Sequence, residues 1–137
     1  MNEKDFLFDT NVLSELIRHP QGALARKMTA LPPDRLRTSI VVACELRYGA
    51  LKKKSPRLQQ KVDQLLELVA VLPLEVEADR HYGQIRTALE RQGRIIGQND
   101  LLIAAHARAL GLTLVTANVA EFSRVPGLSV ENWLGQG

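Results

Sequence analysis

The sequence predicts an α/β protein in which a central, mostly parallel sheet of four or five short strands is sandwiched between helices. Two observations predict this fold. Segments that resemble buried strands alternate with segments of helical periodicity, and strands separated by helices form parallel βαβ units. The predicted strands are also uninterrupted apolar runs, such as FLF at 6–8 and TLV at 113–115. Runs of this kind are expected where helices cover both faces of a sheet.

The chain has the size of one domain, and we expect residues 1–137 to form a single domain. Hydrophobic residues make up 45% of the 137 positions and charged residues 24%. This balance is typical of a globular chain that buries its own core. No internal repeat, low-complexity segment or long linker divides the sequence.

The first half of the chain supplies two strands and three helices. In order, we expect a strand at Phe6–Phe8, a helix through Leu16 and Ile17, a loop at 32–34, a strand at Leu36–Ile40, a helix opened by Ser39 that runs through Leu51, and a helix at Arg57–Val69. Thr10, Asn11 and Ser14 are candidate caps for the first helix. The last helix of this half has apolar residues at helical spacing, from Leu58 to Val69.

The second half continues the alternation. In order, we expect a strand at Val71–Leu74, a helix at Glu75–Gln92, a helix at Asp100–Leu110, a strand at Leu112–Thr116, a short turn or helix at Ala120–Phe122 and a last strand at Leu128–Val130. Gly93 and Gly111 follow the two long helices, and glycine is the residue that most often ends a helix.

Composition narrows the cellular setting. The single cysteine, Cys44, excludes an internal disulfide framework and fits a reduced, cytoplasmic environment. The sequence shows neither a signal-peptide pattern nor an apolar run of the roughly 20 residues that span a bilayer. The net charge of +3 and the sequence pI of about 9.3 permit an anionic partner such as RNA without demanding one.

Polar side chains follow the predicted strands, where ligands bind in open parallel sheets. Asp9 follows FLF, Glu45 lies on the helix after the second strand, Asp100 opens a later helix, and Asn118 follows TLV. Each has a structural alternative. Asp9 suits a helix N-cap, Asp100 suits the positive end of the helix dipole, and Asn118 suits a turn.

Glu45 needs a partner because it lies close to the apolar stripe of its helix. That partner could be an arginine, for which Arg47 and Arg86 are candidates, or it could be a metal ion. Several carboxylates gathered without counterions repel one another, and a divalent cation relieves the repulsion. Oxygen ligands without a histidine or cysteine cluster favour Mg²⁺ or Mn²⁺ over zinc, and Mg²⁺ held in this way usually acts on a phosphate ester.

Three stretches carry a resemblance that covers nearly the whole chain. They are FLFDTNVLSELIR at 6–18, TSIVVACELRYGAL at 38–51, and IGQNDLLIAAHA followed by LGLTLVTAN at 96–118. In this order and spacing they resemble the PIN-domain ribonucleases, specifically the VapC-type toxins of bacterial toxin–antitoxin pairs. The resemblance implies a PIN-like fold and metal-assisted hydrolysis of RNA phosphodiesters in tRNA or ribosomal RNA, with inhibition of translation and growth.

The resemblance also assigns roles to residues. Asp9, Glu45 and Asp100 match the family's metal-binding acids, with Mg²⁺ or Mn²⁺ as the implied cofactor. The fourth position, often an aspartate in relatives, is Asn118, which weakens a second metal position that Glu121 could support with its charge. Thr10 and Ser39 match small polar residues around the site, although capping explains both equally well.

The implied partners are RNA, a small antitoxin that blocks the site with an arginine, a second copy of the chain, and operator DNA reached only through the antitoxin. A basic run could hold RNA phosphates, or it could be an ordinary solvated surface; it comprises Arg47, Lys52, Lys53, Lys54 and Arg57. The apolar helices near Leu16 and over 58–69 could form interfaces or be core. His19, His81 and His106 have no expected role at the site.

Three other interpretations remain open at this point. A phosphoacceptor receiver domain would also place acids at strand ends, but the sequence has no acidic pair after the first strand and no lysine in TAN. Asn118 could mark a catalytically weakened module with a binding or regulatory role. The same site could also serve a metal-dependent nuclease that acts on DNA or in RNA maturation.

Overall fold

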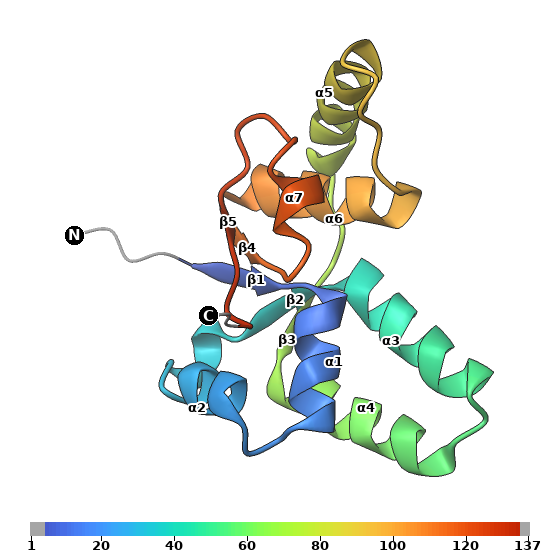
Figure 1. The fold of residues 1–137 in the computed structure, drawn as a ribbon, viewed down its shortest axis with the longest axis vertical. Coiled ribbons are helices and arrows are strands. Elements are labelled where there is room, and N and C mark those ends of the chain that lie inside the picture. The colour runs from blue at the N-terminus through green and yellow to red at the C-terminus, as the bar shows by residue number, and fades with distance from the viewer. Residues whose placement is uncertain (1–4, 135–137) are drawn as a thin grey trace.

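The computed structural model describes residues 5–134, and its centre is a five-stranded sheet in which all neighbouring strands are parallel. The strand order is β3-β2-β1-β4-β5. The strands are β1 (Phe6–Phe8), β2 (Arg37–Ser39), β3 (Ala70–Leu72), β4 (Thr113–Val115) and β5 (Val130–Glu131). Figure 1 shows the sheet in the middle of the molecule with helices around it. The predicted α/β/α sandwich is confirmed.

The connecting helices follow the predicted alternation. They are α1 (Thr10–Arg18), α2 (Ala23–Thr29), α3 (Ile40–Lys52), α4 (Pro56–Leu68), α5 (Ala78–Arg91), α6 (Gln98–Leu110) and α7 (Val119–Phe122), with a 3₁₀ turn, η1, at Pro33–Arg35. Among the residues from 5 to 134, no helix is long and apolar enough to cross a membrane.

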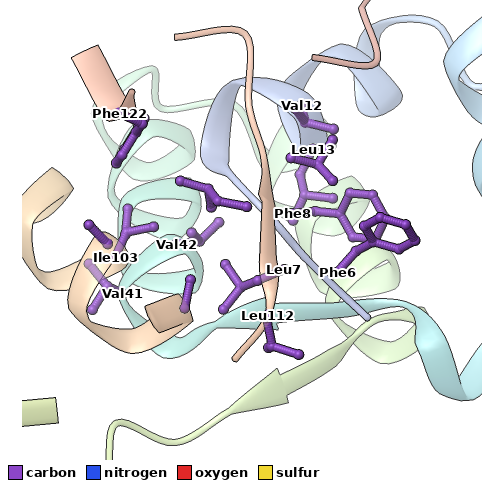
Figure 2. Packing of buried hydrophobic residues seen from close by; sticks show 14 of the residues in the cluster. Phe6, Leu7, Phe8, Val12, Leu13, Val41, Val42, Ile103, Leu112 and Phe122 are labelled. Atoms are coloured by element: carbon purple, nitrogen blue, oxygen red, sulfur yellow. The ribbon is translucent and has the colours of Figure 1, made fainter. Parts of the chain in front are cut away.

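Residues of β1 build core on both sides of the sheet. Figure 2 shows Phe6 and Phe8 on one side of the strand, towards Val12 and Leu13 of α1, and Leu7 on the other. The rings of Phe6 and Phe8 meet Trp133 edge to face, at centroid distances of 4.9 and 5.3 Å. Leu7 and Phe8 are fully buried. The unbroken apolar run FLF is therefore explained by helices that cover both faces.

Several helices differ from the sequence prediction: α6 begins at Gln98 instead of Asp100, α4 is shifted by one residue, and the largest differences concern α2 and α5. Helix α2 was not predicted; it is seven residues long and its N-cap, Gly22, offers no side chain, so it carries neither a long period nor a cap signal. Helix α5 begins at Ala78 rather than at Glu75, because Glu77 has a φ of 97° and cannot belong to the helix. Gly111 adopts the left-handed conformation that ends α6, as predicted.

Strand boundaries differ by a few residues. The last strand pairs at Val130–Glu131 instead of 128–130, because its pairing partners are Leu114 and Val115 of β4. The predicted loop at 32–34 includes part of the turn η1.

The topology places a crevice at the centre of the sheet. From β1 the chain proceeds to β2 and β3 on one side, then returns past β1 to form β4 and β5 on the other. Where the direction of winding reverses, the connections after neighbouring strands diverge and leave a crevice beyond their carboxyl ends. Asp9 follows β1 and Thr116 follows β4, so both lie at this crevice.

Candidate active site

Asp9 is buried at the end of β1 and is held by neighbours on both sides. Its exposed fraction is 3%. Oδ1 accepts a hydrogen bond from the backbone N–H of Thr10 at 2.7 Å, and Oδ2 accepts one from the Thr116 hydroxyl at 2.7 Å. Asp9 is thus the N-cap of α1, as its structural alternative predicted, and its bond to Thr116 also joins the ends of β1 and β4.

Glu45 has polar partners but no cationic one. The Thr10 hydroxyl donates to Oε1, and the Asn99 side-chain amide donates to Oε2 at 3.2 Å. Arg47 instead pairs with Asp63 at 2.6 Å, and Arg86 with Glu90 at 3.1 Å. Within residues 5–134, no ion pair involves Glu45, so the predicted alternative of a salt bridge to either arginine is wrong.

Asp100 lies in the first turn of α6 and is strongly affected by other acids. Its pKa is raised from 3.8 to about 6, first by burial, then by the charges of Asp9, Glu121 and Glu45, and last by a hydrogen bond with Glu121. Burial is also the main cause that raises the pKa of Asp9, against the hydrogen bonds from Thr116 and Thr10 that lower it. The acids from α3, α6, α7 and the end of β1 therefore share one electrostatic environment.

Asn118 and Glu121 act together. The side-chain amide of Asn118 donates to Glu121 Oε1 at 2.6 Å, and its backbone N–H donates to the Thr116 hydroxyl at 2.9 Å. Asn118 occupies the N-cap position of α7 but its side chain makes no capping bond there. Instead it steadies Glu121, whose carboxylate meets Asp100. Glu121 is therefore a more direct member of the cluster than the sequence indicated.

The four acids Asp9, Glu45, Asp100 and Glu121, called the acid cluster from here on, carry uncompensated negative charge. In the described part of the chain, no lysine or arginine forms an ion pair with any of them. The donor set consists of carboxylate and amide oxygens, which suit a hard divalent cation. Over residues 5–134, however, no group of three His, Cys, Asp or Glu side chains is already arranged to hold a metal. The carboxylates must turn towards a common point to share one ion.

Ser39 is not part of the acid cluster. It is fully buried, caps α3 by accepting from the Val41 N–H at 3.0 Å, and lies 2.8 Å from Nδ1 of His106 through its hydroxyl. Its capping alternative is therefore confirmed. His106, for which we expected no role at the site, contacts Ser39 rather than the acid cluster. Burial lowers the pKa of His106, so the neutral ring links α6 to the start of α3.

The sequence analysis missed two residues that organise the site. Thr116 joins Asp9 to Asn118 by accepting and donating hydrogen bonds. Thr116 directly follows the strand TLV, so the rule that polar residues at strand ends form the site, which identified Asn118, could also have identified Thr116. Asn99 lies in the first turn of α6, and its side-chain amide donates a hydrogen bond to Glu45 on another helix. No local pattern signals that contact.

The basic run is mostly free on the surface. Lys52, Lys53, Lys54 and Arg57 are exposed at the end of α3 and the start of α4. Arg47 is the exception, because its guanidinium pairs with Asp63. Of the run, the exposed lysines and Arg57 remain available to an anionic partner.

The fold and the acid cluster define a class: a doubly wound α/β protein with an acidic crevice at the carboxyl ends of its central strands. The chain belongs to the PIN domain family, whose family model matches residues 6–128. The match to the family model confirms the resemblance found in the sequence and excludes the alternative of a phosphoacceptor receiver domain.

Named relatives agree over almost the whole chain. The protein is 39% identical to Ribonuclease VapC2 of Rickettsia felis over 130 residues, which cover 93% of this chain and 97% of that protein. It is 40% identical to the tRNA(fMet)-specific endonuclease VapC of Shigella flexneri over 129 residues, with the same coverage. A chain in the crystal structure of Rickettsia felis VapBC2 bound to a promoter DNA fragment superposes with a TM-score of 0.86 at 37% identity, covering 93% and 98% of the two chains.

Proposed function

We propose that this protein is an endoribonuclease that acts as the toxin of a toxin–antitoxin pair. The observation that carries the proposal is the acid cluster, in which buried and half-buried carboxyl groups repel one another without any cation from the described residues. Such an arrangement costs stability and is typical of a functional site. The names of the similar ribonucleases and the tRNA(fMet)-specific endonuclease support the same activity.

Asp9, Asp100 and Glu45 would hold a divalent cation, which we propose to be Mg²⁺ or Mn²⁺. When bound, such an ion lowers the pKa of water and offsets charge on a phosphate. Thr10 and Thr116 would orient Asp9, while Thr10 and Asn99 would orient Glu45. Asn118 and Glu121 would form a weaker second position, in which Asn118 contributes a neutral amide where an acid would give charge.

The substrate we propose is structured RNA, either tRNA or ribosomal RNA. One relative is named for tRNA(fMet), which supports tRNA first. The exposed Lys52, Lys53, Lys54 and Arg57 would contact phosphates, which position an RNA without reading its sequence. Cleavage of such an RNA would inhibit translation and growth, and it would take place in the cytoplasm.

The protein partner we propose is a small antitoxin. The similar solved structures include VapBC complexes, some described as bound to DNA, which supports a toxin that reaches operator DNA only through its antitoxin. A hollow of about 360 Å³ between α1, α2 and α4 offers an apolar surface for a protein segment; its lining includes Leu16, Ile17, Met28, Leu65 and Leu68. We further propose that the toxin is a homodimer.

The test is cleavage of purified tRNA and ribosomal RNA by antitoxin-free protein with Mg²⁺, Mn²⁺ or EDTA. Asp9→Asn and Asp100→Asn are compared with Asp79→Asn, a matched loss of one carboxylate in the first turn of α5. We expect discrete cuts that need a metal, disappear in the first two variants and persist in the third. Cuts that survive in EDTA, or in folded Asp9→Asn protein, would refute the proposal.

A second candidate function is a catalytically weakened binding module, and Asn118 is the observation that favours it. If this alternative holds, the folded protein will bind a divalent cation weakly and cut no RNA at any metal concentration. Restoring an acid with Asn118→Asp would then produce cleavage where the original chain has none.

A further inference from the structure

A second hollow opens directly beside the acid cluster, between α1, α3 and α4. Its volume is about 310 Å³, at the lower end of the range of small-molecule sites, roughly 300–1,000 Å³. Thr10 and Glu45 form the wall that it shares with the acid cluster. Figure 1 shows the three helices that line it, α1, α3 and α4, in the lower half of the molecule.

The lining of this hollow combines cations with an aliphatic floor. Ile17, Leu46, Leu58 and Val62 provide apolar side chains, and none of the lining residues is aromatic. Arg18 and Lys53 stand at its rim, and both are exposed. This chemistry suits a group that is part apolar and part anionic.

Both cations are available to a ligand. Arg18 bonds Glu15 at 3.0 Å one turn earlier on α1, but its side chain is 61% exposed, and such a surface pair is weak and easily exchanged. Lys53 forms no ion pair within residues 5–134. It is the C-cap of α3, so its side chain begins where that helix ends.

We propose that this hollow is the subsite for a single nucleotide of the RNA, next to the phosphate that lies at the acid cluster. The inference rests on the proposed function. Because Thr10 and Glu45 line the hollow as well as the site, a nucleotide next to a phosphate at the acid cluster can enter it, and the volume suits one nucleotide rather than a duplex. Arg18 and Lys53 bind the flanking phosphate, and the aliphatic floor accepts the sugar and base without an aromatic stack.

The test compares Arg18→Gln and Lys53→Gln with Arg91→Gln, a matched loss of one positive charge. Arg91 is exposed at the end of α5, a helix that Figure 1 shows at the opposite end of the molecule from α1 and α4. We expect KM to rise roughly three- to tenfold for each of the first two variants, and the salt dependence of binding to fall by about one phosphate contact. Arg91→Gln should change KM and the salt dependence of binding only by the small effect of a lower net charge.

A third variant fills the hollow without removing a charge. Gly49 lines it, and a Cβ at this position meets no atom within 4 Å. Gly49→Leu should therefore fold, keep metal-dependent cleavage and raise KM. Circular dichroism and thermal unfolding confirm folding for each variant.

The outcomes separate this subsite from the proposed function itself. Metal-dependent cleavage by the original chain with an unchanged KM in all three variants would overturn the subsite. Variants that lose only inhibition by the antitoxin would also overturn it, and would assign the hollow to an acidic protein segment instead. Absence of cleavage by the original chain would refute the proposed function, and direct binding of uncleaved RNA to the same variants would still decide the subsite.

Discussion

Removing the charge of Asp100 should stabilise the metal-free protein at neutral pH. The pKa of Asp100 is raised to about 6 in the folded state, from a usual value of 3.8, by burial and by the neighbouring acids. At about 1.4 kcal/mol for each pKa unit, this difference corresponds to about 3 kcal/mol. Asp100 is only half-buried, so screening by solvent reduces the figure to roughly 1–2 kcal/mol.

The direction with pH follows from the two protonation states. Well below pH 3.8 the carboxyl is protonated in the folded and unfolded chains, and the neighbouring acids cost nothing through it. As pH rises from 3.8 through about 6, the unfolded chain ionises first, so stability falls. Above a pH of about 6 the protein is less stable by the full free energy of holding the ionised Asp100 carboxylate in the acid cluster. Asp100→Asn avoids that cost but loses about 0.3–1 kcal/mol of interaction with the helix dipole of α6.

We therefore expect Asp100→Asn to raise the free energy of unfolding by about 1 kcal/mol at pH 7.5 in EDTA, with a much smaller gain near pH 4. Urea unfolding followed by circular dichroism measures both values. Asp79→Asn, which also lies in a first helical turn but outside the acid cluster, should give no gain at either pH. Equal gains at both pH values, or a less stable Asp100→Asn protein at pH 7.5, would refute the reasoning.

Three further predictions follow from the same contacts. Gly49→Ala should raise the free energy of unfolding by about 0.5–1 kcal/mol, because alanine is the better helix former and its Cβ meets no neighbour. A lower melting temperature of the variant in thermal unfolding would contradict this. Asn118→Asp should lower the free energy of unfolding of the metal-free protein by about 1–2 kcal/mol, because it replaces a 2.6 Å hydrogen bond to Glu121 by two like charges. The same substitution should tighten Mg²⁺ binding, which calorimetry measures. Leu68→Glu should leave folding and RNA cleavage intact, since Leu68 is 72% exposed. It should weaken antitoxin binding at least tenfold, as measured by surface plasmon resonance. Unchanged affinity would exclude the hollow between α1, α2 and α4 as the antitoxin site.

Some residues of the site can be recognised from the sequence around them, and others depend on contacts between distant segments. Asp9 and Asp100 could be predicted because Asp9 directly follows β1 and Asp100 lies in the first turn of α6, and the apolar patterns of both elements are visible in the sequence. The place of Glu121 could not be predicted, since its contact with Asp100 depends on how α7 lies against α6. The salt-bridge alternative for Glu45 failed for the same reason, because Arg47 pairs with Asp63 of α4 and Arg86 pairs with Glu90 of its own helix.

The sequence by itself determined the alternation of strands and helices, the parallel sheet and the acids at its carboxyl ends. These features depend on side-chain patterns within one element, and hydrophobic burial enforces them locally. Only the tertiary structure decided which polar groups meet. Thr10 reaches Glu45 across 35 positions, Asn99 reaches it across 54, and Thr116 reaches Asp9 across 107. The hollow beside Glu45 arises in the same way, because α1, α3 and α4 each contribute one wall and none of them alone encloses a space.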